Sequence, residues 1–129
     1  MNEAAIDAPD VLGWSLASGL GRVVFGIGML AAPERALRAL GFSDVIPATV
    51  VVTRIAGVRD LVLGVATLGA LDDRRRLRAV SLANAAADTG DTLAFSAALR
   101  SGERDVGVRG LAASLPAAMA GLWTAWRLS

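Results

Sequence analysis

A stretch near the middle of the chain decides the fold, and it reads Thr53-Arg54-Ile55-Ala56-Gly57-Val58-Arg59-Asp60-Leu61-Val62-Leu63-Gly64. It lies inside a run of about 25 otherwise apolar residues, 46–71, which is long enough to cross a lipid bilayer. Two arginines and an aspartate occupy its middle, where membrane helices seldom carry charge. Because such charges usually mark functional sites, we expect the chemistry of the protein to be centred here.

The composition points the same way. Hydrophobic residues make up 54% of the 129 residues, and 14 further positions are glycine. Ordinary soluble domains are less apolar, so a membrane protein is expected. The chain contains no cysteine and no histidine, which excludes disulfides, thiolate nucleophiles, the usual metal ligand and the usual base at neutral pH. Acid–base chemistry must therefore use Asp, Glu, Arg or water. A net charge of +1 without a basic tail predicts no nucleic-acid partner.

Apolar segments separated by polar turns predict an all-α fold. The predicted long helices cover residues 11–31, 46–71, 79–99 and 106–128. A short amphipathic helix over residues 33–41, with Gly41 as its C-cap, is expected to lie flat at the membrane interface. The expected architecture is a single domain over residues 1–129. It is a four-helix transmembrane bundle with a short interfacial helix between its first and second long helices.

Charged and aromatic residues near the segment ends predict the membrane topology. Residues 72–78 form a hydrophilic hairpin with the densest arginine cluster, so the positive-inside rule places it in the cytoplasm, together with both termini. The acidic opening, residues 1–10, lacks the basic start of a secretory signal. Trp14, Trp123 and Trp126 near segment ends are expected to be interfacial anchors. The predicted location is a multi-pass protein of the cell membrane.

Three of the four segments carry a polar stripe, a row of polar or small residues on one helix face. The stripes are Ser15, Ser18, Arg22 and Gly26; Thr53, Gly57, Asp60, Gly64 and Thr67; and Ser81, Asn84, Asp88 and Asp91. Arg54 and Arg59 flank the second stripe. Unpaired buried charge is very unfavourable, so we expect three arginines and three aspartates to pair in one internal network around a cavity. The fourth segment would form an apolar wall.

The pairing inside that network has two interpretations. Asp88 and Asp91 lie one helical turn apart and can share a proton, as close carboxylates do. Alternatively, each aspartate binds its own arginine. The whole network can also be structural, serving only to hold four helices in register.

Several of these residues resemble a known kind of protein. The pattern Arg54-x-x-Gly57-x-Arg59-Asp60-x-x-Leu63-Gly64, the earlier Pro33-x-x-x-Leu37-x-x-x-Gly41 and the later Asp88-x-Gly90-Asp91 resemble the small four-helix integral-membrane families of unknown function. The DoxX-like proteins are a more distant likeness. The resemblance covers residues 22–91 and implies a four-helix membrane bundle with these polar residues at its centre. It implies no reaction.

The functional hypothesis is a membrane-embedded enzyme that acts on a lipophilic small molecule by acid–base catalysis. Epoxide opening, cyclisation and isomerisation suit an Asp/Arg/Asp set, which needs neither metal nor cofactor. Asp88 and Asp91 would be acid and base, Asp60 their partner, and Arg22, Arg54 and Arg59 positioning groups. Ser18, Asn84 and Gly57 are expected to contact the substrate.

Three alternatives remain open at the level of sequence. A small proton-coupled transporter would need a homo-oligomer, for which Ser15-x-x-x-Gly19 and Ala117-x-x-x-Gly121 are packing motifs. An accessory subunit of a membrane complex would use the charges structurally. The weak hydrophobicity of segment 79–99 also allows a soluble Ala-rich bundle.

Overall fold

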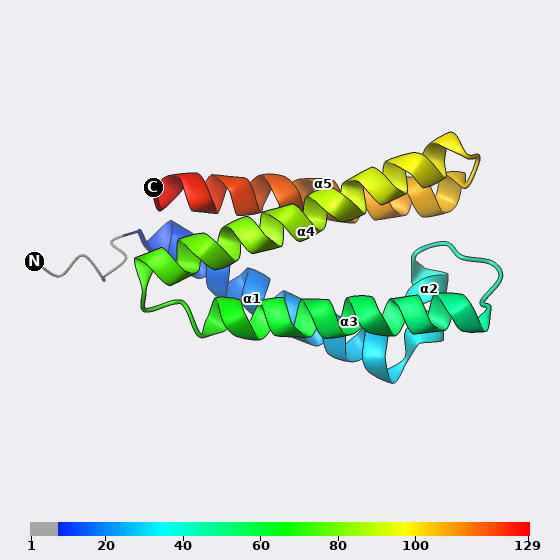
Figure 1. The fold of residues 1–129 in the computed structure, drawn as a ribbon, viewed down its shortest axis with the longest axis horizontal. Coiled ribbons are helices and arrows are strands. Elements are labelled where there is room, and N and C mark those ends of the chain that lie inside the picture. Colours follow the sequence, from blue (N-terminus) through cyan, green and yellow to red (C-terminus); the bar gives the residue numbers. More distant parts are fainter. Residues whose placement is uncertain (1–7) are drawn as a thin grey trace, which may run out of the picture.

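The computed structural model describes residues 8–129, and this part of the chain folds into helices and loops without strands. The helices are α1 (Pro9–Ala31), α2 (Pro33–Ala39), α3 (Pro47–Leu68), α4 (Arg74–Arg100) and α5 (Arg104–Arg127). The four long helices alternate in direction, and α2 lies in the connection between α1 and α3 (Figure 1). The predicted all-α fold with a short helix after the first long one is thus confirmed. Residues 1–7, and with them the predicted side of the N-terminus, lie outside the described residues.

Proline and glycine set the ends of the helices around α2. Pro9, Pro33 and Pro47 each occupy the first turn of a helix, where the missing N–H leaves no bond unmade. Beyond α2, Gly41 has a φ of +95°, which side chains with a Cβ rarely adopt. Its N–H donates to the Arg38 carbonyl at 3.0 Å, and the Phe42 N–H donates to Leu37 at 3.1 Å. This pair of bonds is a Schellman cap, as expected for Gly41.

The basic run after α3 differs from the prediction. Residues 74–78 form the first turns of α4, whereas we expected them in a hairpin loop. Asp73 causes the difference, because its side chain accepts a hydrogen bond from the Arg76 N–H at 2.9 Å and so begins the helix five residues earlier. The charges are still outside, since Arg74, Arg75 and Arg76 are exposed.

The long helices pack mainly as two pairs. α1 packs along α3, and α4 packs along α5 (Figure 1). Between α1 and α3, a Cβ on Gly26 would lie 2.7 Å from the Gly57 carbonyl oxygen, and one on Gly64 would lie 2.8 Å from the Gly19 oxygen. In the second pair, a Cβ on Gly121 would lie 3.1 Å from the Ala85 Cβ. The backbones therefore touch within each pair, which small residues alone permit.

The apolar core is small and lies at one end. Val11, Ala70, Leu77 and Leu128 form a buried cluster where α1 begins and α5 ends. An ion pair between Arg127 and Asp10, 2.8 Å from nitrogen to oxygen, lies at the same end. The two helix pairs are therefore joined at this end by apolar packing and by charge.

Large apolar side chains lie on the outside of the protein and many polar side chains lie inside, which is the opposite of the distribution in water-soluble proteins. Large apolar residues cover the outside, among them Val24 with 70% of its surface exposed and Ile55 with 64%. Among residues 8–129, nine polar or charged residues are buried, including Asp60, Asn84 and Asp88. Soluble domains bury such residues rarely and leave large apolar patches exposed only where something else covers them.

In the described part of the chain, two helices, α1 and α5, are long and apolar enough to cross a membrane. Only 22% of the apolar window of α1 and 28% of that of α5 is buried inside the protein. α3 and α4 carry more charge, so the structure supports two membrane-spanning candidates, fewer than the four that we expected.

Candidate functional site

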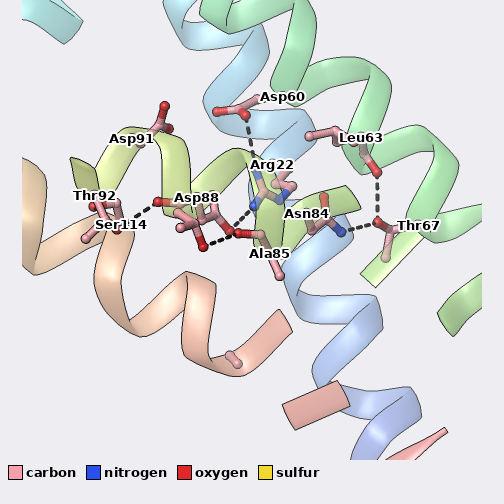
Figure 2. A network of polar contacts seen from close by, with 12 residues as sticks. Arg22, Asp60, Leu63, Thr67, Asn84, Ala85, Asp88, Asp91, Thr92 and Ser114 are labelled. Atoms are coloured by element: carbon pink, nitrogen blue, oxygen red, sulfur yellow. Dashed lines mark hydrogen bonds and ion pairs between the residues drawn. The ribbon is translucent and has the colours of Figure 1, made fainter. Parts of the chain in front are cut away.

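The charged groups converge at the middle of the long helices. Arg22 of α1 points toward both the α3 and the α4 side of the interior (Figure 2). Its Nη1 donates to Asp60 Oδ1 at 3.0 Å, and its Nη2 donates to Asp88 Oδ2. The side chains of Arg22, Asp60 and Asp88 are 12%, 7% and 8% exposed. One buried guanidinium therefore holds two carboxylates that come from two different helices.

Arg59 makes a second connection between α3 and α4. Its two terminal nitrogens bind the two oxygens of Asp91, each at 2.8 Å, which is the bidentate geometry of the strongest ion pairs. Its Nε and Nη2 also approach Asp60 Oδ1, at 3.2 and 3.1 Å. Asp60 thus joins Arg22 to Arg59, and Asp88 and Asp91 each have their own arginine. Of the two predicted pairings, the structure has the one in which each aspartate binds its own arginine. No hydrogen bond among the described residues joins the carboxyl groups of Asp88 and Asp91.

Arg54 does not belong to this network, contrary to our expectation. It is exposed and forms no salt bridge with any described residue. The reason is rotational: Arg54 and Arg59 lie on opposite flanks of Asp60 around α3. The flank with Arg59 faces α4, whereas Arg54 lies among exposed apolar residues such as Val51 and Val58.

The loss of Arg54 changes the charge balance of the cluster. Two guanidinium groups, Arg22 and Arg59, now face three carboxyl groups, whereas we predicted three of each. An uncompensated charge in a low-dielectric interior is strongly unfavourable. The cluster therefore favours holding one proton on a carboxyl group, or one cationic partner.

A cavity of about 870 Å³ lies between the helix pairs and contains the charged cluster in its wall. Its wall is polar toward the end where α1 begins, with Ser15, Thr67, Ser81, Asn84 and Thr124. Toward the α2 end it is apolar, with Phe25, Met29, Leu37, Phe42, Val52 and Phe95. Most of the lining surface is apolar, as in sites for lipophilic ligands.

The three predicted substrate contacts have different positions. Ser18 and Asn84 line the cavity. Gly57 does not line it, because this glycine packs against α1, where an added Cβ would lie 2.9 Å from the Met29 Cβ. The predicted role of Gly57 in substrate contact is therefore wrong, and its small size serves helix packing instead.

Sequence reasoning missed the contribution of α5. We expected an apolar wall, yet Ser114 and Thr124 line the cavity, and the hydroxyls of Ser114 and Thr92 are hydrogen-bonded to each other at 3.0 Å. A signal existed in the spacing of Gly110, Ser114, Ala117, Gly121 and Thr124, which places small or polar residues on one face of the helix.

The glycines of the two proposed self-association motifs are also occupied within the chain. A Cβ on Gly19 would lie 2.9 Å from the Leu68 side chain of α3, and Gly121 packs on Ala85 of α4. These two glycines therefore join helices of one chain.

Within residues 8–129, no group of three or more carboxylate side chains is placed to hold a metal ion. Asp60, Asp88 and Asp91 face guanidinium groups instead.

The family comparison covers nearly all of this site. A family model described as a domain of unknown function (DUF4267) matches residues 19–128, which include α2 to α5, most of α1 and all five charged residues of the cluster. The match carries no link to the DoxX-like proteins. No curated protein and no solved structure matches the chain. The chain therefore belongs to the family described as a domain of unknown function (DUF4267).

Proposed function

We propose that the protein is a multi-pass membrane enzyme that opens epoxides of lipophilic molecules by acid–base catalysis. The observation that carries the proposal is the pair of carboxyl groups, Asp60 and Asp88, on one buried guanidinium in a largely apolar cavity. Cyclisation and isomerisation would use the same groups with an internal nucleophile or a substrate proton in place of water.

Four membrane spans are supported by helix length and by the inverted distribution of side chains. The long helices have 22 to 27 residues, and a bilayer core needs about 20. The charges that lower the hydropathy of α3 and α4 belong mostly to the interior cluster or to the helix ends. Trp123, with the Arg127 guanidinium 5.4 Å from its ring, and Trp126 provide interfacial anchors near the end of α5. The positive-inside rule places the arginine-rich start of α4 in the cytoplasm, and with it the loop before α4 and the end of α5.

The roles of the carboxyl groups follow from the number of donors that each receives. Asp91 binds both terminal nitrogens of Arg59, and Asp60 Oδ1 accepts from both arginines, so each has more than one guanidinium donor. Asp88 receives one guanidinium contact and is the group with the least compensation. Asp88 therefore carries the extra proton and serves as the acid.

The reaction balances with water as the co-reactant. Asp88 gives its proton to the epoxide oxygen while the C–O bond breaks. Asp60 Oδ2, which has no hydrogen bond within the described chain, takes a proton from water as the water oxygen bonds to the carbon. The product is a diol, and the proton on Asp60 must return to Asp88 before the next turnover. Arg22 contacts both carboxyl groups and stabilises the charge on each as it changes.

Turnover of lipophilic epoxides by the intact protein in proteoliposomes tests this function. We expect the wild type to form diols, detected by mass spectrometry with incorporation of oxygen from labelled water. Asp88→Asn should lower turnover by about 100-fold or more, because general acid catalysis contributes at least that much. Asp72→Asn, the same change on an exposed loop residue, should have no effect. Retention of turnover by Asp88→Asn with an unchanged unfolding midpoint would overturn the mechanism.

A proton-coupled carrier is the second candidate, and the thin contact between the helix pairs favours it. Each pair is tightly packed, whereas α3 and α4 touch little and the buried interior between the pairs holds the ion pairs. Such an arrangement allows one pair to move against the other while a carboxyl group gains and loses a proton. Flux of solute into liposomes without chemical conversion would identify a carrier. An accessory subunit would show neither flux nor conversion and would co-purify with a larger complex.

A further inference from the structure

Two buried polar atoms at one end of the cavity lack a partner. Ser15 Oγ and Asn84 Oδ1 form no hydrogen bond within the described chain, although both atoms are shielded from solvent. Both residues line the cavity, and they are only 3% and 6% exposed. A buried polar atom without a partner is unfavourable by about 1–3 kcal/mol, so such atoms in a cavity wall indicate a missing bonding group.

The Ser15 hydroxyl is unlike other hydroxyls in these helices. Thr53 and Thr67 donate to the carbonyl four residues earlier, each at 2.8 Å, which is the usual way to satisfy a hydroxyl in an apolar helix. Ser15 makes no such bond to Val11. Its hydroxyl therefore stays free to donate to, or accept from, a group in the cavity.

The orientation of the Asn84 amide is fixed by its neighbour Thr67. The Thr67 hydroxyl donates its hydrogen to the Leu63 carbonyl at 2.8 Å, so its oxygen can only accept from Asn84. The Asn84 amide nitrogen accordingly donates to Thr67 at 3.0 Å, and its oxygen is turned away from Thr67 (Figure 2). The free atom of Asn84 is thus an acceptor, and its complement must be a hydrogen-bond donor.

We propose that this end of the cavity, defined by Ser15 and Asn84, binds the hydroxyl group of a lipophilic alcohol. The hydroxyl donates to Asn84 Oδ1 and accepts from Ser15 Oγ, so it satisfies both atoms at once. Ser15 precedes Arg22 by seven residues and Asn84 precedes Asp88 by four, which places the hydroxyl roughly 6–10 Å along the helices from the charged cluster. That this alcohol is also the substrate rests on the proposed function, and its reacting group would then lie this far from the hydroxyl.

A permanently bound water is the competing occupant, and the choice of probes separates the two. A long-chain primary alcohol and its methyl ether have nearly the same shape and partition alike into a bilayer, but the ether cannot donate a hydrogen bond. Each probe is titrated into the intact protein in lipid nanodiscs, and the rise in the thermal unfolding midpoint gives an apparent dissociation constant.

We expect the alcohol to bind about tenfold or more tightly than the ether, since a site built for a hydroxyl discriminates against an analogue without a donor. In Asn84→Leu the ratio should fall to about one, whereas Ser96→Ala, which removes a hydroxyl bonded within α4 and outside the cavity wall, should keep it. Equal binding of both probes by the wild type, or no binding of either, would overturn the proposal, as would a ratio unchanged in Asn84→Leu.

A second variant covers the case in which Asn84→Leu does not fold. Ser15→Ala removes only an unpartnered hydroxyl, so the empty protein should unfold at the same or a higher temperature, and the alcohol should bind several-fold more weakly. A lower midpoint of the empty protein with an unchanged affinity for the alcohol indicates a structural water and rejects the alcohol site.

The outcome is independent of the catalytic proposal. Asp88→Asn should lose turnover and keep the preference for the alcohol over the ether. Its carboxyl group belongs to the charged cluster, which lies about 6–10 Å along the helices from Ser15 and Asn84. If the preference holds while no epoxide is converted, the proposed function fails and the hydroxyl site stands. If epoxides are converted without any preference for the alcohol over the ether, the hydroxyl site fails and the proposed function stands.

Discussion

The interface within each helix pair and the seam between the pairs are built in opposite ways. Within the α1–α3 pair, glycines bring two backbones into direct contact, as Gly26 does with Gly57. The seam, by which we mean the contacts of α1 and α3 with α4, surrounds a cavity and is bridged by Arg22–Asp88, Arg59–Asp91 and Asn84–Thr67. The helices of each pair are therefore tightly packed against each other, whereas the cavity and the ion pairs lie in the seam.

The largest expected effect comes from a change inside a pair. Gly26→Val should destabilise the protein by about 4 kcal/mol or more, because the new Cβ would lie 2.7 Å from a carbonyl oxygen and 2.8 Å from the Leu61 nitrogen, and neither backbone atom can move away alone. The measurement is the unfolding midpoint in detergent.

Gly28→Val is the matched control on the same helix, because a Cβ there meets nothing within 4 Å. It should change stability by less than about 0.5 kcal/mol. If the two valine variants were equally stable, the backbone contact between α1 and α3 would not be the feature that holds this pair together.

A change in the seam should have the next largest effect. Arg22→Met leaves Asp88 without its guanidinium and removes one of the two arginines that contact Asp60, so it should destabilise the protein by about 3 kcal/mol. Adding Asp88→Asn should recover part of that loss, since the uncompensated carboxylate is then gone.

The double-mutant cycle separates charge from packing. A coupling between the two substitutions of about 1 kcal/mol or more, obtained from unfolding midpoints of the three variants, would show that the ion pair itself bridges the seam. Additive effects would show instead that Arg22 acts by filling space. In that case ion pairing would not be what joins the two helix pairs across the seam.

The convergence of Arg22, Asp60 and Asp88 could be predicted from sequence for a simple reason. Each residue lies on a polar stripe of its own helix, and an apolar exterior forces the three stripes to face one another. Of the six charged residues that helical spacing predicted for the cluster, the structure therefore brings five together. The same spacing could not place Arg54, because it gives an angle around α3 and says nothing about which neighbouring helix covers which flank.

Two other features depended on information that periodicity does not contain. The start of α4 was predicted too late, since the arginine density of residues 74–78 concealed the capping role of Asp73. The role of Gly57 was misassigned because a glycine on a polar stripe can face either a cavity or a backbone, and only the position of α1 decides between them. Ser15 was on a predicted stripe, but its missing partner becomes visible only when every hydrogen bond is counted.

The smallest effect is expected for a substitution of Arg54, which lies neither in the interface within a helix pair nor in the seam between the pairs. Arg54→Gln should change the free energy of unfolding by less than about 0.5 kcal/mol and leave turnover unaltered, because removing the charge of an exposed side chain without a described partner has little effect. Its position two turns into α3 lets a long side chain extend toward the membrane surface, which Gln does only in part. A loss of turnover comparable to that of Asp88→Asn would contradict this. Arg54 would then have to act from the outer face on another molecule of the protein, and the site would be complete only in an oligomer.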